Sequence, residues 1–572
     1  MKLRLKFLAF VLSCMLIAGT CMGCVKYAMV EDTTISYLYV TVPPGGYGTE
    51  WMENIAERFE ELHKESSYKD GKKGVDIVVQ PTEESKDGTQ LRSNIANSAY
   101  QLFVVEGLNF ASLAATGALY DIDAWAKEDL ADGSGTIESK FYDDQKAALK
   151  AIDDKYYALP VYAGFNGLTY DADLFEHYKL YFADENGVKI NNMSSYTNSE
   201  YTGRGFVNLS TDKKSPGPDG IYGTYDDGLP SSYEEFFYLL DAMTEMTIIP
   251  LIWTGKSTHY TDYLTQSLLT ATSSKTSFSA NFSFNSGSEK LKIVTGFNGD
   301  EPIIEEYAVN DDNGYLVSQQ YEKYKVMKFL FKLYSNEKYY DPSCKTTNIS
   351  NTQAQKMFEE SSLDSKSTPI AMLIEGNYWY NEARPELEES VTRYKDAAKN
   401  RNFRIMPLPS EEFGTVNVNE GRKIMVSDAM YYYMIVNATV KNDPEKEKLA
   451  KDFVQFFYQT ANIQSANVDT GIPLALKYEL TQEQYNSMDN FPQSLWDVYE
   501  DAKKADRYMT PFSTNPIFIN NTVQFDFRTS RFSSSVANFA FTAVRNNISL
   551  VDYFKGMAIS EAQWNTTYNI YN

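Results

Sequence analysis

The sequence predicts an α/β fold, and three observations support this prediction. From residue 35 onward, segments typical of strands alternate with segments typical of helices, which favours parallel βαβ units with helices on both faces of a sheet. The chain has 572 residues, enough for more than one domain at roughly 100–200 residues each. Only Cys344 lies outside the N-terminal leader, so a hydrophobic core rather than a disulfide framework must provide the stability.

The N-terminal elements follow from local pattern. Residues 35–42 (ISYLYVTV) are rich in β-branched and aromatic residues, which favours a strand. A helix is predicted after Thr49, because apolar residues recur at helical spacing from Met52 to Leu62. Thr49 is a residue type that can cap its N-terminus. The same reasoning predicts strands at 75–80 and 102–105 and helices at 90–99 and 110–116. In such sheets, ligands bind at the carboxyl ends of the strands, so residues 43–50 and 106–109 are the first candidates for a site.

The pattern repeats from residue 156, where YYALP leads into an extended segment that ends at 170. A helix is predicted near Asp173, and a helical pattern returns at 231–246. Residues 180–230 between them form a polar insertion rich in glycine and aspartate. Further extended segments are predicted at 405–410 and 471–473.

The first 24 residues have the pattern of a secretory signal: a cationic start, an apolar run from Phe7 to Ala18 and a small residue at the end. The apolar run is too short to span a bilayer. Its end resembles a bacterial lipoprotein signal, which implies that Cys24, or alternatively Cys21, carries lipid. Residues 25–32 then form a tether, and the folded part is expected at the extracellular face of the cell membrane.

Composition limits the classes of partner. The formal net charge of −24 repels nucleic acid and gives no attraction to anionic lipid. No other apolar run reaches a membrane-spanning length. Aromatic residues make up 14% of the chain, and the 43 tyrosines outnumber the 33 phenylalanines. Such rings, with an apolar face and a hydrogen-bonding edge, suit surfaces that contact amphipathic ligands.

Five segments, in this order, resemble the carbohydrate-binding group of the extracellular solute-binding proteins of bacterial ABC importers. They are residues 113–125 (LAATGALYDIDAW), 156–175 (YYALPVYAGFNGLTYDADLF), 229–243 (LPSSYEEFFYLLDAM), 353–380 with AMLIEGNYWY, and 444–473 with AKDFVQFF and GIP.

The resemblance implies the two-lobed fold of class II periplasmic binding proteins, with the ligand held between the lobes. Lobe 1 would comprise residues 33–158 and 408–470, and lobe 2 residues 159–407 and 471–572. The insertion at 180–230 and the stretch at 275–320 are extra. The implied function is capture of a carbohydrate, expected to be an oligosaccharide, and its delivery to the transmembrane subunits of an ABC permease. The protein is expected to act as a monomer.

A sugar site needs flat rings for the C–H faces and carboxylates or amides for the hydroxyls, because charge-assisted hydrogen bonds are the strong ones. The candidates are the residues of these types that follow the predicted strands and crossings: Tyr47, Glu50, Trp51, Glu106, Tyr162, Asn166, Trp253, Tyr260, Glu375, Tyr378 and Trp379.

The family's motif places a ligand-stacking aromatic residue just after the glycine that is here Gly376, which favours Tyr378 or Trp379. Core packing is the alternative for each ring, since large aromatic residues are highly buried on average. For Trp379 the stacking role is the prediction, so Trp379→Ala is expected to weaken sugar binding without unfolding the protein.

A glycine-rich loop at 217–228 (GPDGIYGTYDDG) holds three candidate calcium ligands, Asp219, Asp226 and Asp227. The spacing does not fit an EF-hand, and an exposed turn cluster of Asp and Gly is the alternative. No cofactor is predicted apart from this candidate structural calcium.

No catalytic motif is evident, and the chain is predicted not to be an enzyme. Two other classes stay open. A secreted glycoside hydrolase needs two carboxylates about 5–10 Å apart across the scissile bond, which the sequence does not exclude. A peptide or other polar solute needs a basic residue for its carboxylate, which Arg92, Arg204 or Arg384 could supply.

Overall fold

The computed structural model describes residues 32–82, 84, 88–106, 110–150, 153–164, 166–184, 203–208, 212–410, 432–504, 515, 517, 525–526, 531–532 and 539–568. The predicted signal peptide, with Cys21 and Cys24, and nearly all of the tether lie outside these residues. None of the helices in the described part of the chain combines the length and the apolar composition that crossing a bilayer requires.

The first sheet has five strands in the order β2-β1-β3-β11-β4. β1 (Ser36–Val42) lies parallel to β2 (Val75–Pro81) and β3 (Leu102–Glu106), which confirms the three predicted strands within a residue. β11 (Tyr432–Val436) is antiparallel to both β3 and β4 (Ala158–Pro160). A late segment of the chain therefore completes an early sheet.

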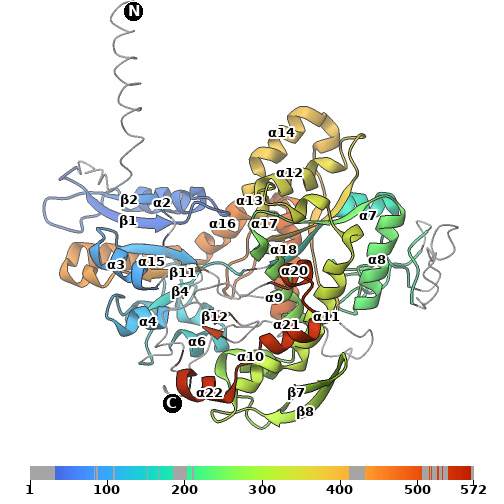
Figure 1. The fold of residues 1–572 in the computed structure, drawn as a ribbon. Coiled ribbons are helices and arrows are strands. Elements are labelled where there is room, and N and C mark those ends of the chain that lie inside the picture. Colours follow the sequence, from blue (N-terminus) through green and yellow to red (C-terminus); the bar gives the residue numbers. More distant parts are fainter. Residues whose placement is uncertain are drawn as a thin grey trace, which may run out of the picture.

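α2 (Glu50–His63) is the helix predicted after the first strand, and it buries Trp51, Ile55 and Phe59. Thr49 stands at its N-cap position, but the Thr49 hydroxyl donates a hydrogen bond to the Glu53 carboxylate (2.7 Å) instead of accepting one from the backbone. α15 (Pro444–Phe457) and α16 (Thr460–Thr470) contact α2, so segments about 400 residues apart in the sequence share this layer (Figure 1).

The second sheet has four strands in the order β10-β5-β9-β6. They are β10 (Phe403–Met406), β5 (Asn166–Asp171), β9 (Ile370–Gly376) and β6 (Ile249–Ile252). Every residue of β9 is buried. The helix predicted at 231–246 is α8 (Tyr233–Glu245), whose N-cap Ser232 accepts a hydrogen bond from the Glu235 amide (3.1 Å).

The two sheets define two lobes, which confirms the predicted two-lobed α/β fold. Figure 1 shows β1, β2 and α3 on one side of the molecule and α7 and α8 on the other. The chain crosses between the sheets from β4 to β5 and again from β10 to β11. It crosses a third time after α16, because α18 (Asn490–Lys504) packs on β10. β4 extends the first sheet to Pro160, just beyond the predicted lobe limit at 158.

A satellite core lies outside the main one. The extra stretch at 275–320 contains a hairpin of β7 (Lys290–Asn298) and β8 (Glu301–Ala308). Phe284 and Ile293 from this stretch pack in a separate cluster with Ile559 and Trp564 from the C-terminal region. The end of the described chain therefore stabilises an insertion near its middle.

The other helices connect or cover these elements. They are α3 (Gly88–Asn97), α4 (Phe110–Ala115), α5 (Asp123–Lys127), α6 (Asp143–Leu149), α7 (Ala172–Tyr178), α9 (Thr261–Thr272), α10 (Lys275–Ser283), α11 (Tyr321–Ser335), α12 (Asn351–Ser361), α13 (Trp379–Glu382), α14 (Arg384–Tyr394), α17 (Gln482–Ser487), α20 (Ala540–Arg545), α21 (Leu550–Gly556) and α22 (Glu561–Gln563).

Candidate functional site

Most of the predicted site residues gather where the two lobes meet. Tyr47 follows β1 and Glu106 ends β3, both in lobe 1. In lobe 2, Asn166 begins β5 directly opposite Gly376 at the end of β9, because the two strands are antiparallel. Tyr162 lies in the crossing between the two sheets. The carboxyl ends of strands from both lobes therefore meet at this junction, as the sequence predicts.

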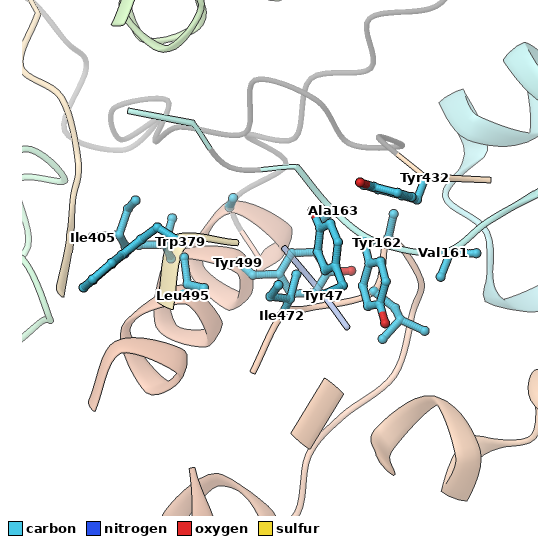
Figure 2. Close-up of a cluster of buried hydrophobic side chains, with 14 of the residues drawn as sticks. Tyr47, Val161, Tyr162, Ala163, Trp379, Ile405, Tyr432, Ile472, Leu495 and Tyr499 are labelled. Carbon is cyan, nitrogen blue, oxygen red and sulfur yellow. The ribbon is translucent and has the colours of Figure 1, made fainter. Parts of the chain in front are cut away.

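An aromatic cluster occupies the lobe 1 side of the junction. The ring of Tyr47 stacks on the ring of Tyr162 with centroids 4.5 Å apart and an interplanar angle of 7°. Tyr432 packs edge-on against Tyr47 (4.7 Å), and Trp51 packs edge-on against Tyr162 (5.2 Å). Figure 2 shows the three tyrosines together. Since these rings are buried and cover one another, they form a rigid base for the junction.

Two of these rings, Trp51 and Tyr162, were predicted to contact a ligand but are buried. Trp51 and Tyr162 are each 1% exposed, so neither offers a free face to a ligand. The indole N–H of Trp51 donates to the Gly48 carbonyl (3.0 Å), and Phe457 covers the ring from the other direction. Both residues belong to the core of the junction. In this structure neither ring is open to a ligand.

Three tyrosines lie on the lobe 2 side, and they are only partly buried. The Tyr263 and Tyr378 hydroxyls are 2.6 Å apart, and the rings of Tyr260 and Tyr263 lie 5.1 Å apart. Burial, and then the charge of Glu375, raises the pKa of the Tyr260 and Tyr263 hydroxyls above its usual value. These groups are therefore neutral hydrogen-bond donors and acceptors at physiological pH.

A pair of carboxyl groups, buried Glu375 and half-buried Glu382, lies close to these tyrosines. The amide nitrogen of Gln355 in α12 donates to the Glu375 carboxyl (3.1 Å) and to the Glu382 carboxyl (3.0 Å). Glu375 is 1% exposed. Burial, followed by the charge of Glu382, raises the pKa of Glu375 well above its usual value. Burial also raises the pKa of Glu382. Glu375 thus supports the site from below rather than facing a ligand.

Amide side chains continue the site along the edge of the lobe 2 sheet. Asn166 donates from its amide nitrogen to the Gln266 side-chain oxygen (3.3 Å), and its backbone carbonyl accepts a hydrogen bond from the Ser267 hydroxyl. The amide of Asn377 donates to the Ala163 carbonyl in the crossing (2.9 Å). Aromatic rings, amide groups and carboxyl groups therefore lie close together on this side of lobe 2.

The two lobes touch directly at Tyr378. Its ring centroid lies 6.4 Å from that of Tyr47. A Cβ atom at Gly46, where φ is +68°, would stand 2.7 Å from the Cβ of Tyr378. Nearby, the Asn381 side chain donates to the Thr470 carbonyl (2.6 Å) at the end of α16. Glycine at position 46 thus allows the lobe 1 loop to approach the lobe 2 tyrosine.

The predicted ligand contacts of Trp379 and Trp253 are wrong. Trp379 is fully buried, with Phe358, Phe403 and Phe491 packed edge-on around it at centroid distances of 5.2–5.8 Å. Figure 2 places it beside Ile405 and Leu495, away from the tyrosine cluster. Trp253 is also fully buried, among Tyr334, Tyr340 and Phe541. Both tryptophans belong to the core of lobe 2.

Of the remaining candidates, Glu50 is exposed in the first turn of α2, and Glu106 is half-buried opposite Tyr432 in the β3–β11 ladder. Sequence reasoning missed Gln266, Gln355, Glu382 and Tyr432. No local signal marks these four residues, because each reaches the junction through a contact with a segment distant in sequence.

The basic residues considered for a carboxylate ligand have other surroundings. Arg204 pairs with Glu235 (2.8 Å) on α8, away from the junction. Arg92 is exposed on α3. Arg384 reaches the Asp469 carbonyl with one guanidinium nitrogen (3.4 Å).

The glycine-rich loop at 217–228 uses its carboxylates to hold its own backbone. Asp226 accepts from the Asp219 amide (2.9 Å), Asp219 from the Ile221 amide (2.6 Å), and Asp227 from the Gly223 amide (2.8 Å). Burial and then the charge of Asp219 raise the pKa of Asp226. Within the described ranges, no group of three or more His, Cys, Asp or Glu side chains is arranged to hold a metal ion. These carboxylates therefore hold the turns of the loop itself.

A cavity of about 690 Å³ lies elsewhere in lobe 2. Its lining includes Ile249 and Ile370, the first residues of β6 and β9. The cavity therefore lies at the amino ends of these two strands, whereas Glu375 lies at the carboxyl end of β9. Lys356 in its wall is paired with Glu389 (3.0 Å). Tyr394 is its single aromatic residue. The junction, rather than this cavity, brings together the rings and polar groups that the sequence predicted.

Comparison with known proteins gives the following similarities. Residues 45–223 match the family described as bacterial extracellular solute-binding protein. No curated protein matches the chain. Among solved structures, the chain is similar to the solute-binding protein RafE in complex with raffinose (13% identity, 93% of this chain and 99% of that chain, TM-score 0.49). It is also similar to apo RafE from Streptococcus pneumoniae (14%, 95% and 99%, 0.48) and to a chitin oligosaccharide binding protein (14%, 94% and 99%, 0.49).

Proposed function

We propose that the protein is the solute-binding component of a bacterial ABC importer and that it binds a carbohydrate between its lobes. The observation that carries the proposal is the junction itself. There, the partly exposed rings of Tyr260, Tyr263 and Tyr378 stand beside amide and carboxyl groups, opposite the loop that follows β1. The match of residues 45–223 to the solute-binding family supports the same function.

The proposed mechanism is hinge closure about the three crossings. A sugar that contacts the lobe 2 tyrosines and the lobe 1 loop together binds the closed form better than the open form, and therefore shifts the population toward it. The closed form would be the one that the permease recognises. In this mechanism the protein needs no catalytic group and acts as a monomer.

Calorimetry with neutral oligosaccharides tests the proposal. We expect saturable binding of at least one member of a panel of raffinose, maltotriose and chitotriose, with no product sugars on prolonged incubation. Tyr378→Phe, which removes one hydroxyl, should weaken this binding about tenfold by leaving a polar partner unpaired. Release of shorter sugars would instead establish the glycoside hydrolase, and binding of peptides alone would establish the other alternative.

We also propose that Cys24 carries the lipid anchor that holds the protein at the extracellular face of the membrane. Two or more acyl chains would hold it stably, whereas one would not. Metabolic labelling with a fatty acid should mark the wild-type protein and the Cys21→Ala variant but leave Cys24→Ala unlabelled. Labelling that is lost only in Cys21→Ala would move the anchor to that residue.

Calcium binding by the loop at 217–228 stays a proposal with a direct test. A bound cation would relieve the repulsion between Asp219 and Asp226, both of which are buried. We therefore expect a chelator to lower the melting temperature of the wild-type protein but not that of Asp226→Asn. A melting temperature that the chelator leaves unchanged in both proteins would exclude the site.

A further inference from the structure

The segment that carries Tyr378 is tied on both sides to the chain that runs between the lobes. Before the tyrosine, the side-chain amide of Asn377 donates to the Ala163 carbonyl in the crossing that follows β4 (2.9 Å). After it, the amide of Asn381 donates to the Thr470 carbonyl, where α16 of lobe 1 ends and the third crossing begins (2.6 Å). Tyr378 is therefore held between two hydrogen bonds that lead out of the lobe 2 sheet.

The two crossings that accept these hydrogen bonds are themselves joined. The Ala163 amide donates to the Pro473 carbonyl (2.9 Å), and the Ala475 amide donates to the Val161 carbonyl (3.0 Å). An antiparallel bridge lies between these two hydrogen bonds. Because the crossings are paired in this way, the segment from Asn377 to Asn381 is linked to both of them as one unit.

Two carbonyl groups at the end of α16 accept hydrogen bonds from lobe 2. The last four carbonyl groups of a helix have no partner inside the helix. Asn381 donates to the carbonyl of Thr470, and the guanidinium of Arg384 donates to the carbonyl of Asp469 (3.4 Å). The guanidinium also places a positive charge at the negative end of the helix dipole. Separation of the lobes at this point would leave both carbonyl groups to water.

We propose that Asn377 and Asn381 are positioning residues for sugar binding, which hold Tyr378 in place relative to the two crossings and favour the conformation in which the lobes touch. The inference rests on the proposed function and specifies how the site is prepared for its ligand. A sugar then meets a ring that already stands against the lobe 1 loop, so less of its binding free energy is lost in bringing the lobes together. Neither asparagine needs to contact the sugar itself.

The distance between the lobes in the absence of sugar tests the inference. Spin labels are attached to Glu57→Cys on α2 and Glu388→Cys on α14, which are exposed positions in different lobes of the mature protein. Cys344 is buried and does not compete for the label. Asn381→Leu and Asn377→Leu each remove the donor and keep a side chain of similar size. We expect both variants to move the distance distribution, measured by pulsed electron paramagnetic resonance, toward longer distances than in the wild type.

Gln493→Met is the matched control. This half-buried amide donates to the Tyr485 and Met488 carbonyls, so its hydrogen bonds stay within lobe 2 and its loss should leave the distances unchanged. Distributions equal to the wild type in the asparagine variants would overturn the inference. If neither variant folds, Arg384→Gln alters an exposed donor to the same helix end and should shift the distribution in the same direction. An unchanged distribution in that variant would overturn the inference equally.

Affinity provides the second measurement. For any neutral oligosaccharide that binds the wild-type protein, Asn381→Leu should weaken binding about fivefold in calorimetry, whereas Gln493→Met should bind as the wild type does. Unchanged affinity in Asn381→Leu would overturn the inference. If no sugar binds the wild type, the proposed function fails, whereas the distances measured without sugar still decide whether the asparagines position the lobes.

Discussion

Replacing Trp379 by alanine should lower the free energy of unfolding by roughly 3–5 kcal/mol, the usual cost of removing a large buried ring. The indole is fully buried, and Phe358, Phe403 and Phe491 surround it. These neighbours come from a helix, a strand and a second helix, so they cannot all move in to fill the cavity. Urea denaturation of the purified protein measures the change.

The control for this prediction is Trp379→Phe, which keeps an aromatic ring in the same cavity and should cost less than Trp379→Ala. Tyr378→Ala is the matched neighbour: its ring is partly exposed at the junction, so it should affect sugar affinity more and stability less. A folded Trp379→Ala protein with wild-type stability and weakened sugar binding would restore the stacking role that the sequence predicted.

Replacing Gly46 by alanine should weaken sugar binding at least tenfold, because it holds the lobes apart. The new Cβ atom would lie 2.7 Å from the Cβ of Tyr378, which is not a flexible atom that can turn aside. The backbone at Gly46 also has a φ of +68°, which costs a residue with a side chain roughly 1–2 kcal/mol. Calorimetry measures the affinity, and denaturation measures the stability.

The loop after β1 contains two control positions that separate the clash with Tyr378 from the backbone strain. Gly48 has a φ of +66° with no atom within 4 Å of an added Cβ, so Gly48→Ala carries the backbone strain without the clash. Gly45 has the same free space and no positive φ, so Gly45→Ala should behave as wild type. If Gly46→Ala and Gly48→Ala reduce affinity equally, the approach of Gly46 to Tyr378 plays no part in binding.

Much of the fold follows from local sequence pattern. The strand at 36–42 is recognisable by its β-branched and aromatic residues, and α2 by apolar residues that recur at helical spacing. The pairing of β11 between β3 and β4 is different, since nothing near Tyr432 indicates that it belongs with strands some 270 or more residues earlier.

The structure brings several of the predicted site residues together at the junction and buries others in the core. Gly376 marks the end of β9 and leads to the junction, where Tyr378 contacts the other lobe. Trp379 begins α13, and successive helical residues point in different directions, so it faces the core instead. Whether a ring after this glycine faces the ligand or the core depends on Phe358, Phe403 and Phe491, which no local pattern connects to it.

The strand order has a consequence for how the protein matures. Neither sheet can be completed from the first half of the chain. The first sheet needs β11, and the second needs β10, on which α18 packs. The satellite cluster needs a residue that comes still later in the sequence, Trp564. During synthesis from the N-terminus, the early strands can therefore pair into a complete lobe only after residues beyond 400 have been made.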